Sequence, residues 1–157
     1  IPTFEAQADT GNRILDTILT AKRLQCMNQG INMTCVADGK SLSFMEDMDI
    51  TALFWNALDN AIESVMKVQD PSRRLIHVAV SRKKGFLVIE VGNAFEGKIL
   101  FKKGLPQTTK GDERYHGFGT RSIQSTVRRY GGHVSFTAKN QWFELKATIP
   151  VRKAEEK

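Results

Sequence analysis

Two pairs of adjacent strand-like runs constrain the fold more than any other feature of this sequence. Residues 75–81 and 86–92 are rich in β-branched side chains and are joined by Arg-Lys-Lys-Gly, which predicts a hairpin. Residues 133–138 and 142–149 predict a second hairpin near the end of the chain. Hairpins form antiparallel sheets, and such a sheet must bury one face against another layer.

Amphipathic helices are predicted where that second layer is needed. Residues 11–28 and 48–68 carry apolar side chains at helical spacing, with Asp49 in a position to cap the second helix. A third helix is predicted over 119–130, and a short strand over 31–37. This order favours an α+β fold: a two-layer α/β sandwich whose mixed, mostly antiparallel sheet of about five strands packs on about three helices.

The formal net charge of +6 over 157 residues invites anionic partners such as nucleotide phosphates, nucleic acid or an acidic protein face. The basic residues are dispersed, so we expect no nucleic-acid partner. No apolar run approaches the ~18 residues of a membrane span. Cys26 and Cys35 show neither a disulfide framework nor metal-ligand spacing, so we expect free thiols.

One face of the second helix combines polar side chains. Asn56, Asn60 and Glu63 follow i, i+4, i+7 spacing, which places two carboxamides and a carboxylate together. Asparagine is a poor residue inside a helix, so this pair needs a reason. Carboxamide oxygens and phosphates can share a hard cation such as Mg²⁺. An exposed polar stripe, or two satisfied core asparagines, explains the same pattern.

Three further features point to an anionic or nucleotide ligand. Between Asn93 and His116 no apolar period is sustained, and a connection this long is usually functional or mobile. Gly117-Phe118-Gly119 follows this lysine-bearing segment immediately before the third helix, where backbone N–H groups can approach a phosphate. An ordinary turn has the same sequence. Asn93 can hold the edge of a base by its amide, or can be a turn residue.

Taken together, FWNALDNAIES, GNAFEG and TTKGDERYHGFGTRSI resemble the ATP-binding catalytic domain of sensor histidine kinases, in the superfamily shared with gyrase, heat-shock ATPase chaperones and MutL. The resemblance is closest to kinases of peptide-sensing and quorum-sensing receptors. It implies an ATP-binding catalytic domain over 13–151 with a long ATP lid at about 94–116. Residues 1–12 would end an upstream dimerisation helix or form a linker, and 152–157 would form a charged tail.

The resemblance implies roles for individual residues. Asn60 would bind the Mg²⁺ that bridges the triphosphate. Asn56 stands where gyrase and the chaperones have a water-activating glutamate, which implies phosphoryl transfer to a protein over simple hydrolysis. Asn93 stands where most histidine kinases have the aspartate of an Asp-x-Gly-x-Gly box that grips the adenine amino group. Asp59 and Glu63 would support the metal site or assist the incoming imidazole.

The same resemblance assigns the remaining candidates to the phosphates. Lys110 and His116 match positions on the phosphate side of the lid. The loop around the phosphates would comprise Gly117, Phe118, Gly119 and Thr120. The implied catalytic residues are Asn56, Asn60 and Glu63. The implied ATP-binding residues are Asn56, Asn60, Asn93, Lys110, His116, Gly117, Phe118, Gly119 and Thr120.

The function implied is that of an ATP-dependent protein-histidine kinase in a two-component system. It would transfer the γ-phosphoryl of Mg·ATP to a histidine on an upstream dimerisation hairpin outside this chain, because none of His77, His116 and His133 lies in an acceptor-like helix. We expect a response regulator as partner, a homodimeric full-length receptor, a monomeric fragment, and a place on the cytoplasmic side of a membrane. The alternative is a nucleotide-gated protein-interaction module without kinase activity.

Overall fold

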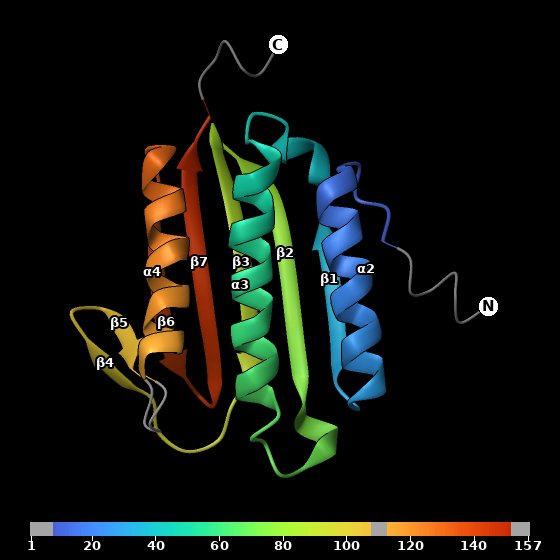
Figure 1. Ribbon diagram of the computed structural model, residues 1–157, viewed down its shortest axis with the longest axis vertical. Coiled ribbons are helices and arrows are strands. Elements are labelled where there is room, and N and C mark those ends of the chain that lie inside the picture. The colour runs from blue at the N-terminus through green and yellow to red at the C-terminus, as the bar shows by residue number, and fades with distance from the viewer. Residues whose placement is uncertain (1–7, 108–112, 152–157) are drawn as a thin grey trace.

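The computed structural model describes residues 8–107 and 113–151, and the side chains of 8–107 and 119–151. Figure 1 shows long helices side by side on one face of a twisted sheet. In chain order the elements are α2 (Arg13–Asn28), β1 (Asn32–Ala37), the 3-10 turn η1 (Gly39–Leu42), α3 (Asp47–Val65), the 3-10 turn η2 (Pro71–Arg73), β2 (Leu75–Lys83), β3 (Phe86–Ala94), β4 (Leu100–Lys102), β5 (Leu105–Gln107), α4 (Glu113–Arg129), β6 (His133–Lys139) and β7 (Trp142–Pro150).

The main sheet has the strand order β1-β2-β3-β7-β6. Only β1 and β2 pair in parallel, while β2–β3, β3–β7 and β6–β7 pair antiparallel. Both predicted hairpins are therefore present, and their strands meet in the centre of the sheet through β3 and β7. The structure confirms the predicted α+β sandwich with a mixed, mostly antiparallel five-stranded sheet.

The core lies between the helices and one face of the sheet. On β3, Leu87, Ile89 and Val91 belong to this core, because alternate residues of a strand share a face. Asn93 is the next residue of that series. The strand pattern therefore brings a carboxamide to the same face at the end of β3.

The structure corrects two predicted helix starts. The N-cap of α3 is Glu46, and Asp49 lies within the first turn of the helix, so the predicted capping role of Asp49 is wrong. The third helix, α4, begins at Glu113. The segment Gly117–Thr120 consequently lies inside the helix, and the prediction that it forms a loop before the helix is also wrong.

The segment after β3 is more ordered than its composition predicts. It contains the hairpin of β4 and β5, in which Leu100 pairs with Gln107. Lys103 and Gly104 form the turn, with φ values of 54° and 79°. Two consecutive left-handed residues are what a tight two-residue hairpin requires.

Three smaller findings complete the description of the fold. Residues 8–12, within the segment predicted as a helix end or linker, carry no helical structure. Cys26 and Cys35 are free thiols, as predicted. Across residues 8–107 and 113–151, no helix has both the length and the apolar character that a membrane crossing requires.

Candidate functional site

A cavity of about 200 Å³ lies between the C-terminal half of α3 and the ends of β3 and β7. The segment after β3, the strand β5 and the helix α4 complete its wall. Most of the side chains deep in the wall are apolar, and the charged ones belong to α3 and the segments that follow α3 and β3. The lining residues include Asn60, Glu63, Asn93, Phe95, Thr120 and Phe143.

Asn60 reaches this cavity from the middle of α3. On α4, Gly119 faces it: a Cβ added to Gly119 would lie 3.6 Å from both the Nδ2 and the Oδ1 of Asn60. The glycine therefore leaves the carboxamide accessible in a space that a side chain would fill. Thr120, the next residue of α4, is buried and also lines the cavity.

Glu63 lies almost one turn after Asn60 on α3 and lines the same cavity. Together they offer a carboxamide oxygen and a carboxylate, which suit a hard cation. Among the described side chains, no three His, Cys, Asp or Glu residues are grouped to hold a metal ion. The donor set thus fits Mg²⁺ as it is commonly bound, with one or two protein ligands plus phosphate oxygens and water.

The structure separates Asn56 and Asp59 from this cavity. Asn56 lies at the contact between α3 and α4, where its Nδ2 donates to the Oγ of Ser122 over 3.5 Å. Asp59 faces α2 and forms an ion pair with the buried Lys22, whose Nζ also lies 3.7 Å from the centre of the Trp55 ring. The catalytic role implied for Asn56 stays a prediction.

Asn93 occupies the inner part of the cavity. The residue is 2% exposed, and its Nδ2 donates to the carbonyl of Ala94 over 3.0 Å. This bond fixes the amide and leaves Oδ1 as the atom that can accept from a ligand. A buried acceptor next to apolar lining residues such as Val91 and Phe143 suits the exocyclic amino group of adenine.

The predicted phosphate residues are only partly within the described structure. Thr120 lines the cavity, and Gly119 lies opposite the Asn60 amide. Gly117 and Phe118 lie in the first turns of α4, together with His116. Lys110 lies outside the described residues, and the side chains of His116 and Phe118 lie outside the described side chains.

The aromatic part of the wall is not predicted from the sequence. Phe95, Phe136 and Phe143 all line the cavity. The rings of Phe136 and Phe143 are stacked, with centroids 6.1 Å apart and planes 26° apart. These residues come from separate segments, so no local period reveals them. The one signal in the sequence is Phe95 itself, which stands where the Asp-x-Gly-x-Gly pattern has its first glycine.

A polar network fixes α4 against α3 at the end away from the cavity. The Asp49 carboxylate accepts from the Tyr130 hydroxyl and from the Nη2 of Arg129, the latter over 2.7 Å. The Tyr130 oxygen also accepts from the backbone N–H of Glu46. The hydrogen bond from Tyr130, and to a lesser extent the one from Arg129, holds the pKa of Asp49 below its ordinary value. The helices that carry Asn60 and Thr120 are thereby held in register.

Comparisons with solved structures identify the fold. The catalytic domain of histidine kinase ThkA superposes with a TM-score of 0.63 at 14% identity, covering 87% of this chain and 90% of that chain. Histidine kinase AdeS from Acinetobacter baumannii gives 0.62 at 9% identity, over 89% of this chain and 64% of its own. The blue-light activated histidine kinase EL346 from Erythrobacter litoralis gives 0.60 at 15%, over 96% and 66%.

The chain thus spans just under two thirds of the AdeS and EL346 chains, and the fold is the one found in histidine kinase catalytic domains. None of the curated proteins matches the sequence. The family described as the GHKL domain matches residues 45–150, which includes α3, the cavity and α4. The chain belongs to the GHKL domain family.

Proposed function

We propose that this chain binds Mg·ATP and transfers the γ-phosphoryl to a histidine on a helical dimerisation hairpin outside the chain. The observation that carries the proposal is the meeting of Asn60, Asn93 and Thr120 at one cavity. These residues come from α3, β3 and α4, and each matches a position implied to contact a different part of the nucleotide. Membership of the GHKL domain family supports the same assignment.

In this proposal the cavity separates the recognition of the base from that of the phosphates. Asn93, buried among apolar side chains, accepts from the adenine amino group through Oδ1. Asn60 holds Mg²⁺ through its carboxamide oxygen, with Glu63 close to the same region of α3. Bound Mg²⁺ neutralises charge on the phosphates, which is the main requirement of phosphoryl transfer besides positioning.

The chemistry of Asn56 favours transfer over hydrolysis. A carboxamide does not act as a general base, and Asn56 donates to Ser122 instead of lining the cavity. A water molecule is therefore not activated from this position. The acceptor imidazole is itself a nucleophile, so it needs alignment more than activation.

The wider assignment rests on the resemblance in sequence. We propose that the chain is the kinase part of a dimeric two-component receptor of the peptide- or quorum-sensing type. It would lie on the cytoplasmic side of a membrane, with a response regulator as its phosphorylation partner.

The test combines this chain with the helical hairpin of the same receptor, supplied as a separate chain, and labelled ATP. We expect phosphate on the hairpin that is labile in acid and stable in base, as for a phosphohistidine. A hairpin with its histidine replaced by glutamine is the matched control and should stay unlabelled. Mg²⁺-dependent ATP binding without any labelled hairpin would reject the kinase and leave a nucleotide-gated interaction module.

A further inference from the structure

Phe95 places an aromatic ring in the cavity wall at a position where the Asp-x-Gly-x-Gly pattern of most histidine kinases has glycine. Counted from Asn93, the Asp-x-Gly-x-Gly pattern places its first glycine at position 95, and this chain has phenylalanine there. Phe95 lines the cavity and is 6% exposed. A ring at this position fills space that the glycine of the usual pattern leaves open.

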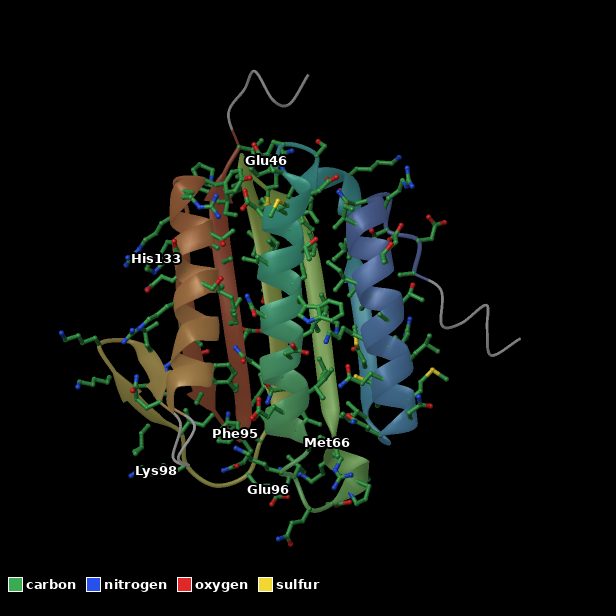
Figure 2. The ribbon with its side chains drawn as sticks, viewed as in Figure 1. Glu46, Met66, Phe95, Glu96, Lys98 and His133 are labelled. Atoms are coloured by element: carbon green, nitrogen blue, oxygen red, sulfur yellow. The ribbon has the colours of Figure 1, made fainter. Side chains whose placement is uncertain are left out.

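The backbone at Phe95 is fixed from two sides. Ala94 ends β3 in register with Trp142 of β7, and the N–H of Phe95 donates to the carbonyl of Gln141 over 3.1 Å. Figure 2 shows Phe95 at the end of the molecule where α3 ends, with Glu96 and Met66 nearby. The ring is thus held beside the inner part of the cavity, two residues from Asn93.

Two more rings lie in the same wall. Phe136 and Phe143 also line the cavity and stack on one another. Phe143 is the register partner of Asn93 across β3 and β7. Asn93 therefore shares the cavity wall with aromatic side chains from three segments of the chain.

We propose that Phe95, together with Phe136 and Phe143, forms an aromatic wall that stacks against the nucleotide base, an inference that rests on the proposed function. Asn93 is neutral, so its bond to an amino group is weaker than the charge-assisted bond an aspartate makes. Stacking of a base on an aromatic side chain contributes about fivefold or more in affinity. The aromatic wall thus contributes affinity for the base, whereas the neutral Asn93 amide only orients the base.

The experiment compares ligands with and without a base. Affinities for Mg·ATP and for Mg·tripolyphosphate are measured by calorimetry on the wild-type chain and on Phe95→Leu. The matched control is Phe86→Leu, because Phe86 is 44% exposed at the start of β3 and does not line the cavity. Phe95→Met, whose flexible side chain can fill the gap left by the ring, replaces Phe95→Leu if that variant does not fold.

We expect Phe95→Leu to bind Mg·ATP at least about fivefold more weakly, with unchanged affinity for Mg·tripolyphosphate. Phe86→Leu should match the wild type for both ligands. Unchanged affinity of Phe95→Leu for Mg·ATP, or equal losses for the two ligands, would overturn the stacking role while leaving the proposed function intact. Failure of the wild-type chain to bind Mg·ATP would instead refute the proposed function and this inference with it.

Discussion

Replacing Gly119 by alanine should raise the stability of the domain and lower its affinity for nucleotide. Gly119 lies inside α4, where glycine costs about 0.5–1 kcal/mol relative to alanine. The added Cβ would lie 3.6 Å from both the Nδ2 and the Oδ1 of Asn60, which is ordinary van der Waals contact. No steric term therefore cancels the gain, and the melting temperature should rise by about 2–4 °C.

The effect on binding should have the opposite sign. Mg²⁺ lies about 2.1 Å from its oxygen ligands and keeps several of its waters. A methyl group 3.6 Å from the Asn60 Oδ1 would intrude on that shell. We expect Gly119→Ala to weaken Mg·ATP binding by at least about tenfold, or 1.4 kcal/mol.

Calorimetric titration with Mg·ATP and a thermal unfolding scan of the same sample measure both effects. Ser125→Ala is the matched control, because Ser125 is exposed on the same helix and does not line the cavity. It should gain slightly in stability and bind nucleotide like the wild type. Full nucleotide affinity in Gly119→Ala would refute the placement of the metal and phosphates between α3 and α4.

Two further predictions concern pH and stability. Asp49→Asn should lower the free energy of unfolding by about 1.5 kcal/mol or more at neutral pH, because it weakens the bonds from Tyr130 and Arg129 to a charged group. The pKa of Asp49 is lowered in the folded state. In urea unfolding, the difference in stability between the wild type and Asp49→Asn should therefore be full above the ordinary pKa of aspartate and should disappear as the pH falls through the folded pKa. Burial, and then the nearby Glu90, raise the pKa of Glu144, so its contribution to stability should fall as the pH rises above its ordinary pKa. Glu144→Gln should accordingly unfold at a higher temperature than the wild type at pH 7 but not at pH 4, and equal melting curves at both values would contradict this.

The sequence predicts those parts of the fold that depend on local chemistry. Gly30 follows α2 with φ of 70°, as a glycine after the last turn of the predicted helix indicates, whereas the cap at Asn12, which accepts from the N–H of Leu15, was not predicted. The turn between β2 and β3 places Lys84 and Gly85 in the left-handed region, the geometry that a tight hairpin needs. Such signals act within a few residues, so they survive in any tertiary context.

The sequence does not predict the features decided by distant contacts. Aspartate is a residue type that often caps a helix. The partners of Asp49 are instead Arg129 and Tyr130, some 80 residues away at the end of α4. The strands β4 and β5 have three residues each, too few to show a period. The glycines near position 117 indicate a loop, yet they lie within a helix that starts at Glu113.

The candidate site divides in the same way. Asn60, Glu63 and Asn93 were identified from the sequence, and the structure brings them to one cavity. Phe136 and Phe143 are ordinary strand residues by pattern, and only the pairing of β6 with β7 places them together. Spacing along a helix reveals a shared face, whereas the far wall of a cavity depends on strand order.

The central claim, that Asn60 holds a metal-bound nucleotide in this cavity, is tested most directly by titrating the chain with an ATP analogue. The titration is made with Mg²⁺ and again with excess chelator, on the wild type and on Asn60→Ala. Thr51→Ala, an exposed substitution on the same helix, is the control. We expect Mg²⁺-dependent binding that falls at least about tenfold in Asn60→Ala and stays unchanged in Thr51→Ala. Equal affinity of the wild type and Asn60→Ala would contradict the claim.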